Sequence, residues 1–272
     1  MGRAVLLDLD ETLIEEEPAA AAAFEATAAF AFAQTGEGLD TSSFVAAARA
    51  KARELWRASN GSDYCTAIGI SSTEGLWCRF EGDDAPTRAL RTWAPSYRRT
   101  VWSSALQAHG MTDDGLVETL AERFATERRA RHRVFPDVVS ALAELQEDYA
   151  LGLVTNGASC LQREKLEASG LRRFFDVVVV SAEVGVGKPE AAIFRHALAR
   201  LDAPPEDAAM VGDSLARDID GAVAAGLSAI WINRFRRQRP ERWEGLLEIT
   251  SLSQAPRVLA RRNAATVRAP PT

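Results

Sequence analysis

Four short apolar runs in the second half of the chain alternate with amphipathic stretches, and this alternation most limits the folds open to it. The runs lie at 151–154, 177–180, 208–211 and 229–232, and helical spacing fills the gaps between them. A fifth run, at 4–7, opens the chain. Strands that are apolar along their whole length are buried on both faces, which is typical of parallel sheets covered by helices. The sequence therefore predicts an α/β fold, a Rossmann-like doubly wound parallel sheet with at least five strands.

The segment 14–134 separates the first strand from a helix that begins near Pro136, and it contains almost no strand pattern. Helical spacing recurs within it at 19–33, 44–56, 97–108 and 115–131. The stretch 60–95 is rich in Gly, Ser, Thr and Asp and gives no clear prediction. We expect a core domain of residues 1–13 and 135–260 with an inserted α-helical domain, and a loose tail at 261–272.

Charge and composition exclude several classes of partner. The formal net charge is −6 and no basic stripe with interleaved aromatics occurs, so we expect no nucleic-acid partner. No apolar stretch reaches the ~20 residues that span a bilayer. The N-terminus leads into a strand without a signal peptide, so we expect no membrane partner and a cytoplasmic location. Cys65, Cys78 and Cys160 are odd in number and widely spaced, which indicates reduced thiols.

Lysine is scarce in this chain. It occurs only at Lys51, Lys165 and Lys188, and arginine supplies the rest of the 32 basic residues. A lysine that is retained against this bias is a candidate for a role that needs a compact ammonium group. The Ala- and Arg-rich, Lys-poor composition is also typical of a GC-rich bacterial genome.

Two carboxylates follow the first predicted strand. Asp8 and Asp10 lie at its carboxyl end, where open parallel sheets bind ligands. Two like charges at this spacing repel each other unless a cation lies between them, so the pair indicates a metal site. Taken alone, the same pair is equally typical of aspartates that cap a turn.

Polar residues follow two further strands. Thr155, Asn156 and Gly157 offer a hydroxyl and backbone N–H groups before a helix, which suits an anionic oxygen but also an ordinary turn. Lys188 lies in the loop after the run at 177–180. Its ammonium could lie over a phosphate or neutralise carboxylates, and a solvated loop lysine is the alternative.

A second carboxylate pair follows the fourth strand. Asp213 and Asp218 flank another junction between a strand and a helix, and Gly212 allows the backbone to approach closely. Helix capping would explain Asp213 but not Asp218.

These segments, in this order, resemble the haloacid dehalogenase-like (HAD) hydrolase superfamily, with the pattern Asp-x-Asp-x-Thr, then Thr, then Lys, then paired Asp. The inserted helices resemble the C1 cap of subfamily I. The core resembles N-acylneuraminate 9-phosphatase and its nucleotidase relatives. The stretches that carry this closer resemblance are Thr155-Asn156-Gly157, Gln162-Arg163-Glu164-Lys165-Leu166-Glu167, Phe175-Asp176-Val177-Val178-Val179, Lys188-Pro189, Ile193-Phe194, Met210-Val211-Gly212-Asp213-Ser214 and Trp231-Ile232-Asn233.

The resemblance implies a reaction through an aspartyl phosphate. Asp8 is then the nucleophile that attacks phosphorus, and Asp10 is the acid that protonates the leaving alcohol and later the base that activates water. Mg²⁺ is the implied cofactor, held by Asp8, the Asp10 main-chain carbonyl and Asp213. Asp218 holds a metal-bound water or orients Lys188.

The same resemblance implies a site for the transferring phosphoryl group. Thr155, the Asn156 backbone, Gly157 and Lys188 bind its oxygens. The expected function is a Mg²⁺-dependent phosphatase of a small phosphorylated metabolite, with sugar phosphates first and nucleoside monophosphates second. The expected state is a monomer or a homodimer.

The inserted helical domain is expected to act as a cap that selects the substrate. Its tryptophans indicate helix packing or a pocket that stacks a sugar or base, and its arginines indicate a solvated face or a second anion site. The residues concerned are Trp56, Trp77, Trp93, Trp102, Arg88, Arg91, Arg98 and Arg99.

Four other functions remain open. A dehalogenase on this scaffold would need neither Asp10 nor a metal. A phosphonatase would need a cap lysine, for which Lys51 is the only candidate in the sequence. A phosphomutase would return the phosphoryl group to a sugar. A non-catalytic binding protein would share the fold without the chemistry.

Overall fold

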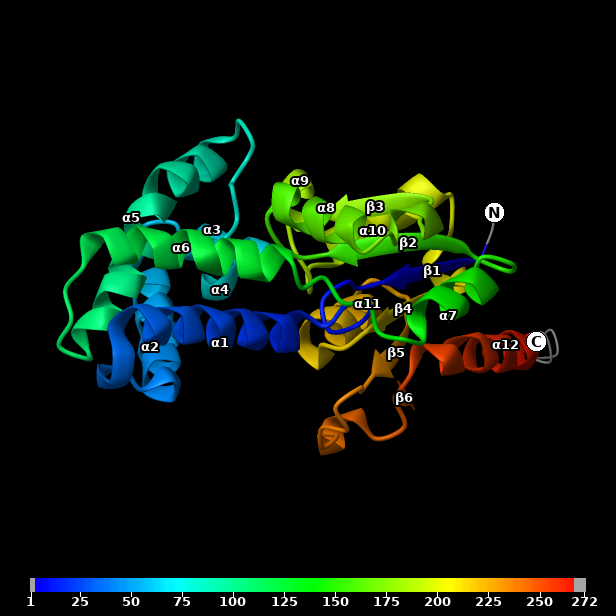
Figure 1. Cartoon of the computed structure of the whole chain (residues 1–272). Coiled ribbons are helices and arrows are strands. Elements are labelled where there is room, and N and C mark those ends of the chain that lie inside the picture. The colour runs from blue at the N-terminus through cyan, green and yellow to red at the C-terminus, as the bar shows by residue number, and fades with distance from the viewer. Residues whose placement is uncertain (1–2, 267–272) are drawn as a thin grey trace.

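The computed structural model describes residues 3–266, which contain one six-stranded sheet (Figure 1). The strand order is β3-β2-β1-β4-β5-β6, and every neighbouring pair is parallel. The strands are β1 (Ala4–Leu7), β2 (Ala150–Thr155), β3 (Val177–Val180), β4 (Ala208–Gly212), β5 (Ser228–Ile232) and β6 (Leu247–Ile249). The prediction of an α/β fold with a doubly wound parallel sheet is confirmed, and β6 adds an edge strand that was not predicted individually.

Helices cover both faces of the sheet. They are α7 (Val138–Leu145), α8 (Ser159–Ala168), α10 (Ala191–Leu201), α11 (Asp220–Ala224) and α12 (Ala255–Thr266). Val5 and Leu7 of β1 pack in a core with α7, α8 and α12, whereas Ala4 and Leu6 pack in a second core with α10 and α11. Because successive strand residues point to opposite faces, burial on both faces requires an uninterrupted apolar run.

Helices α1 to α6 lie between β1 and α7 in the sequence and pack beside the carboxyl end of the sheet (Figure 1). They are α1 (Glu16–Thr35), α2 (Thr41–Ala58), α3 (Ser62–Ile68), α4 (Ser72–Gly75), α5 (Ala85–Gln107) and α6 (Asp114–Arg129). We call this segment the cap. Its core contains Phe24, Phe44, Trp102 and Phe124, with 4.5 Å between the ring centroids of Phe24 and Phe124. Large aromatic side chains thus supply much of the apolar surface that holds the cap together.

The middle part of the cap, for which no clear prediction was made, contains helices. The stretch 60–95 holds α3, α4 and the first half of α5, which continues through Pro95 although proline lacks the N–H of a helical hydrogen bond. The Asp84 side chain accepts a hydrogen bond of 2.9 Å from the Thr87 N–H and caps this helix. Leu90 and Ala94 are buried on the face before the proline. The stabilisation from capping and packing therefore outweighs the helical hydrogen bond that Pro95 cannot donate.

The first part of the predicted tail at 261–272 is helical, because α12 continues to Thr266. Buried Leu259 packs in the core that α12 shares with α7. Only Val258 and Leu259 are large apolar residues within α12, so its sequence periodicity is weak. Residues 267–272 lie outside the described part of the chain.

Two further expectations concern membrane spans and cysteines. Over residues 3–266, no helix combines the length and the apolarity that crossing a bilayer requires. The three cysteines are free thiols, and the Sγ atoms of Cys78 and Cys160 are 3.7 Å apart.

Candidate active site

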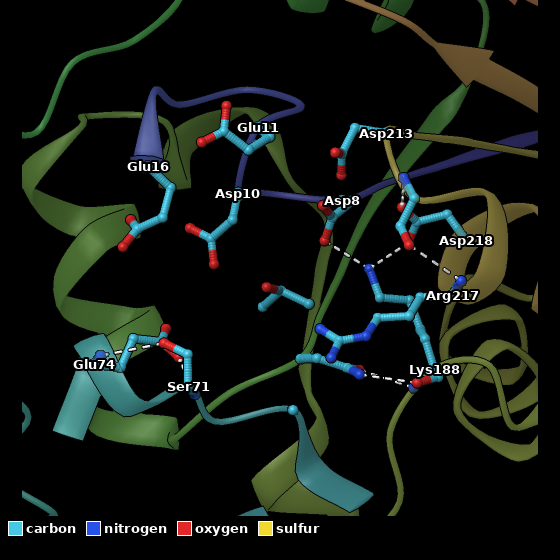
Figure 2. A pocket seen from close by; sticks show the side chains of 14 residues that line it. Asp8, Asp10, Glu11, Glu16, Ser71, Glu74, Lys188, Asp213, Arg217 and Asp218 are labelled. Carbon is cyan, nitrogen blue, oxygen red and sulfur yellow. Dashed lines mark hydrogen bonds and ion pairs between the residues drawn. The ribbon is translucent and has the colours of Figure 1, made fainter. Parts of the chain in front are cut away.

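The predicted functional segments meet where the strand order reverses. β1 lies between β2 and β4, so the chain winds outward in both directions from this pair of strands. Ligands of such sheets bind in the crevice at this switch point. A cavity of about 300 Å³ opens there (Figure 2). The residues that line it are Asp8, Asp10, Glu11, Glu16, Gly69, Ser71, Glu74, Thr155, Asn156, Lys188, Asp213, Ser214, Arg217 and Asp218.

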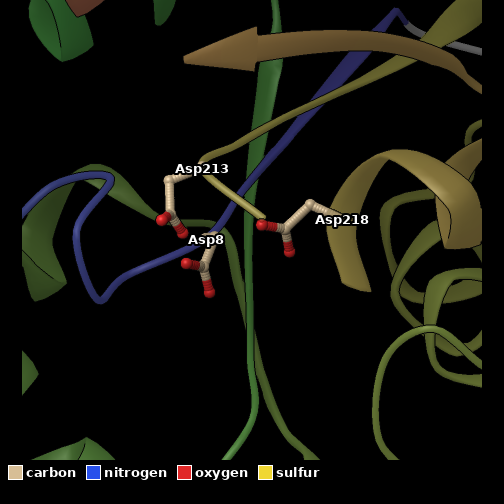
Figure 3. Close-up of side chains that lie close together, drawn as sticks. All are labelled: Asp8, Asp213 and Asp218. Atoms are coloured by element: carbon tan, nitrogen blue, oxygen red, sulfur yellow. The ribbon is translucent and has the colours of Figure 1, made fainter. Parts of the chain in front are cut away.

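Three carboxylates form one cluster in this cavity. Asp8, Asp213 and Asp218 each offer an oxygen within 4.8 Å of the others (Figure 3). Thr12 fixes the spacing of two of them, because its hydroxyl donates to Asp8 Oδ2 at 3.4 Å and accepts from the Asp213 N–H at 3.1 Å. The Trp231 indole N–H donates to the Asp213 carbonyl at 2.8 Å. Asp8 and Asp213 are therefore held by contacts from the loop after β1 and from β5.

The electrostatics of this cluster suit a divalent cation. Burial, and then the charges of Asp8 and Asp218, raise the pKa of Asp213 to about 8. Burial raises the pKa of Asp218 to about 6, although Lys188 opposes this shift. Carboxylate oxygens at this spacing are the hard donors that Mg²⁺ prefers, and a bound ion would remove their mutual repulsion. The residues present thus fit the implied metal.

Lys188 supplies the positive charge beside the cluster. Its Nζ lies 2.6 Å from Asp8 Oδ1 and 2.7 Å from Asp218 Oδ1 (Figure 2). Burial alone would lower the pKa of Lys188, but the charges of Asp218 and Asp8 outweigh it and raise this pKa. The Asn156 side chain holds the lysine backbone, because its amide donates to the Lys188 carbonyl at 2.9 Å and its Oδ1 accepts from the Lys188 N–H at 2.8 Å.

The predicted phosphate-binding residues after β2 fall into two groups. Thr155 and Asn156 line the cavity, and the Gln162 amide donates to Thr155 Oγ1 at 2.7 Å. Gly157 does not line the cavity, and its N–H donates to Ser181 Oγ at 2.9 Å. A phosphate-binding role for Gly157 remains a prediction, and it would require this N–H to change its partner.

Asp10 lies on the other side of the cavity from Asp213 and Asp218, next to Glu16 and Glu74 (Figure 2). Both of its carboxylate oxygens lie 3.1 Å from Lys165 Nζ. Burial raises the pKa of Asp10 to about 7, although the charge of Lys165 opposes this shift. A carboxyl group with this pKa carries a proton in a substantial fraction of molecules at neutral pH.

The cap contributes small and acidic groups to the cavity wall. Glu16, Gly69, Ser71 and Glu74 line it, and Arg217 of the core lies opposite. Among the residues of the described chain that line this cavity, there is no aromatic side chain and no cap arginine. The cap tryptophans instead pack within the cap: Trp77 and Trp102 are fully buried and Trp56 contacts Trp93 and Tyr97.

Sequence reasoning assigned no role to Thr12, Gln162 and Lys165, which support the site. Thr12 belongs to the first motif, but its hydrogen bond to Asp213 joins residues far apart in the chain. Gln162 and Lys165 lie on α8 and contact Asp10 across the site. The scarcity of lysine was the one feature that could have drawn attention to Lys165.

Gly212→Ala tests the close packing behind the cluster. An added Cβ would lie 2.3 Å from Asp218 Cγ, so Asp218 must move and Lys188 loses one of its two partners. We expect overpacking to lower the free energy of unfolding by about 1–3 kcal/mol. We also expect at least a tenfold lower kcat, on the order of what misplacing a charged group costs.

Gly115→Ala is the matched control for this substitution, because the same methyl group would lie on α6 with only the Asp113 side chain within 4 Å. Thermal melting of both variants measures the loss of stability, and steady-state kinetics measures the loss of kcat. Wild-type kcat in Gly212→Ala would contradict the requirement for this position of Asp218.

Comparisons of the sequence and of the structure with known proteins agree on the kind of relative that they find. The family model of the haloacid dehalogenase-like hydrolases matches residues 3–226. The chain is 39% identical to the phosphoserine phosphatase of Thermus thermophilus over 87% of this chain and 91% of that protein. It is 37% identical to the N-acylneuraminate-9-phosphatase of Mus musculus over 52% of this chain and 58% of that protein. The magnesium-bound structure of YfnB from Bacillus subtilis has a TM-score of 0.63 and 25% identity, covering 95% of this chain and 98% of that chain.

Proposed function

Because the chain belongs to the haloacid dehalogenase-like hydrolases, we propose that it is a Mg²⁺-dependent phosphatase of a small phosphorylated metabolite. The observation that carries this proposal is the convergence of Asp8, Asp213 and Asp218 around Lys188 at the switch point of the sheet. The phosphatase names of its relatives support the same reaction class. Hydrolysis then proceeds through an aspartyl phosphate on Asp8.

Asp8 and Asp10 divide the covalent and proton-transfer chemistry. An oxygen of Asp8 forms a bond to phosphorus while the bond to the leaving oxygen breaks. Asp10 gives its proton to that oxygen, and the alcohol departs. Asp10 then takes a proton from the water that attacks the phosphoenzyme, which releases phosphate and restores Asp8. The raised pKa of Asp10 supports its role as the initial acid.

The other polar groups bind and orient the phosphoryl group. Thr155, the Asn156 backbone and Lys188 would contact its oxygens, and Asp218 would hold the Lys188 ammonium in place. Asp8, the Asp10 main-chain carbonyl and Asp213 would hold Mg²⁺, with the carboxylate of Asp218 in reach. When bound, this ion neutralises carboxylate charge and stabilises the charge of the transferring group.

The cavity favours a small polar leaving group. The described residues of its wall include no aromatic side chain but do include Ser71, Glu16 and Glu74, so it offers hydrogen bonds rather than a surface for stacking a base. We therefore place sugar phosphates first, add the phosphoserine of the Thermus relative, and place nucleoside monophosphates lower. The cap would close over the sheet edge and exclude water from the phosphoenzyme. A cytoplasmic monomer or homodimer completes the proposal.

Phosphate release from a panel of phosphate esters tests this function. The panel contains sugar phosphates, O-phosphoserine, nucleoside monophosphates and p-nitrophenyl phosphate. Free phosphate and the dephosphorylated alcohol are the expected products. An isomerised sugar phosphate would indicate a phosphomutase instead. Absence of any turnover with Mg²⁺ would reject the proposal.

Metal removal provides a separate prediction. EDTA treatment should lower kcat/KM for p-nitrophenyl phosphate about 100-fold, because buried Asp8 and Asp218 and half-buried Asp213 then face the incoming phosphate dianion without a cation. Excess Mg²⁺ should restore activity to the wild-type protein but not to Asp213→Asn, which loses one of the proposed ligands. Full activity after complete demetallation would contradict the assignment of the cluster.

A further inference from the structure

Lys165 is a buried cation that the proposed reaction does not use. Its side chain is fully buried, and its ammonium has three N–H donors. These donors face three carboxylates: Nζ lies 3.1 Å from Asp10 Oδ1, 3.2 Å from Glu16 Oε2 and 2.9 Å from Glu74 Oε1. A buried ammonium is unfavourable unless it is paired in this way. Its pairing joins segments that lie far apart in the sequence.

The three carboxylates come from different parts of the molecule. Asp10 belongs to the loop after β1, Glu16 begins α1, and Glu74 lies on the short cap helix α4. Glu16 also pairs with buried Arg128 of α6. Lys165 itself lies on α8, and Leu161 of α8 and the preceding Ala158 pack in the apolar core of the cap. The ammonium thus connects the sheet edge, α8 and the cap at one point.

Lys165 and Gln162 together fix the orientation of Asp10. They lie three residues apart and so share a face of α8. The Gln162 amide donates to Asp10 Oδ2 at 2.9 Å, and the same amide lies 2.7 Å from Thr155 Oγ1. Both oxygens of Asp10 are therefore restrained, and Gln162 links Asp10 to a residue proposed to bind the phosphoryl group.

We propose that Lys165 is a positioning residue: it holds the Asp10 carboxyl group beside the leaving oxygen and couples that position to the cap through Glu74. This inference rests on the proposed phosphatase reaction. Movement of α4 away from the sheet would remove Glu74 from the ammonium and loosen its hold on Asp10. Proton donation would then be most effective when the cap covers the cavity.

The test compares two esters that differ in their need for a proton donor. Phenoxide is a poorer leaving group than p-nitrophenoxide, so phenyl phosphate depends more on Asp10. Lys165→Met should lower kcat/KM about 100-fold for phenyl phosphate and less than about tenfold for p-nitrophenyl phosphate, because misplacement of a proton donor costs on the order of 10². In an Asp10→Ala background the same substitution should cause no further loss for phenyl phosphate.

Glu74→Gln is the milder second variant if Lys165→Met folds poorly. Glutamine keeps the capping box with Ser71 but removes the charge that faces Lys165. It should lower kcat/KM about fivefold for phenyl phosphate and keep kcat/KM for p-nitrophenyl phosphate within about twofold of the wild-type value. These losses are smaller than those expected for a fully misplaced proton donor. Lys51→Met is the matched control, because Lys51 pairs with Glu54 at the surface of α2, far from any role in the site, and should give wild-type values for both esters.

Two failures can be told apart. Equal losses for both esters in Lys165→Met and Glu74→Gln would assign Lys165 a purely structural role and overturn this inference. A further loss from Lys165→Met in the Asp10→Ala background would also overturn it. If the wild-type protein hydrolyses neither ester, the proposed phosphatase function itself fails.

Discussion

Asp8→Asn should lower turnover at least about 10⁴-fold, as loss of a covalent nucleophile does in other enzymes. The amide keeps the shape of the carboxylate but cannot form a stable acyl phosphate. It also removes one of the two charges that pair with Lys188 and one member of the metal cluster. A 10⁴-fold loss corresponds to about 5.5 kcal/mol of transition-state stabilisation. Phosphate release with Mg²⁺ and saturating p-nitrophenyl phosphate measures it.

Asp63→Asn is the matched control for this experiment, because it makes the same chemical change on an exposed residue of α3. It should retain wild-type turnover. Thermal melting of Asp8→Asn distinguishes lost chemistry from lost folding. A folded, pure Asp8→Asn protein with more than about one hundredth of wild-type turnover would contradict the nucleophile assignment, since ordinary proton-transfer contributions alone are of that size.

The parallel sheet was predictable because its strands are buried on both faces. The runs at 4–7, 151–154, 177–180, 208–211 and 229–232 all correspond to strands, and their order along the chain implied crossover helices. β6 was missed because only three residues form it at the sheet edge, too few for a pattern. The burial of a whole strand on both faces thus predicts the fold better than any single residue does.

The convergence of the candidate catalytic segments was predictable for a related reason. Asp8 and Asp213 each follow a buried strand and Thr155 is the last residue of one, and parallel strands bring their carboxyl ends to one edge. The topology of the sheet therefore brings these residues together independently of how the cap packs. Lys188 and Asp218 follow longer connections, yet both lie in the same cavity.

The contacts between cap and core were not predictable from spacing. Glu74 belongs to α4, a helix too short to show periodicity, and it reaches Lys165 across the sheet edge. In the sequence, Asp10 and Lys165 are separated by the whole cap. Such contacts depend on how the cap packs against α8, and no local sequence pattern predicts that packing.

Asp10→Asn should trap the phosphoenzyme and lower steady-state turnover of p-nitrophenyl phosphate about 10³–10⁴-fold, which is the upper range for loss of a general acid and base. Asparagine keeps one acceptor oxygen, which in the place of Oδ2 can accept from both Lys165 and Gln162, but it cannot take a proton from water. Phosphorylation of Asp8 by p-nitrophenyl phosphate needs little help from a proton donor. Hydrolysis of the resulting phosphoenzyme does need a base, so this intermediate should accumulate.

Rapid mixing with p-nitrophenyl phosphate should therefore give a burst of one p-nitrophenol per active site, followed by slow release. Mass spectrometry of the acid-quenched protein should find one phosphoryl group on the peptide that contains Asp8. The Asp8→Asn/Asp10→Asn double variant should show neither the burst nor the label. A burst-free Asp10→Asn protein that still releases phosphate at the wild-type rate would show that another group serves as base and would contradict the assignment of Asp10.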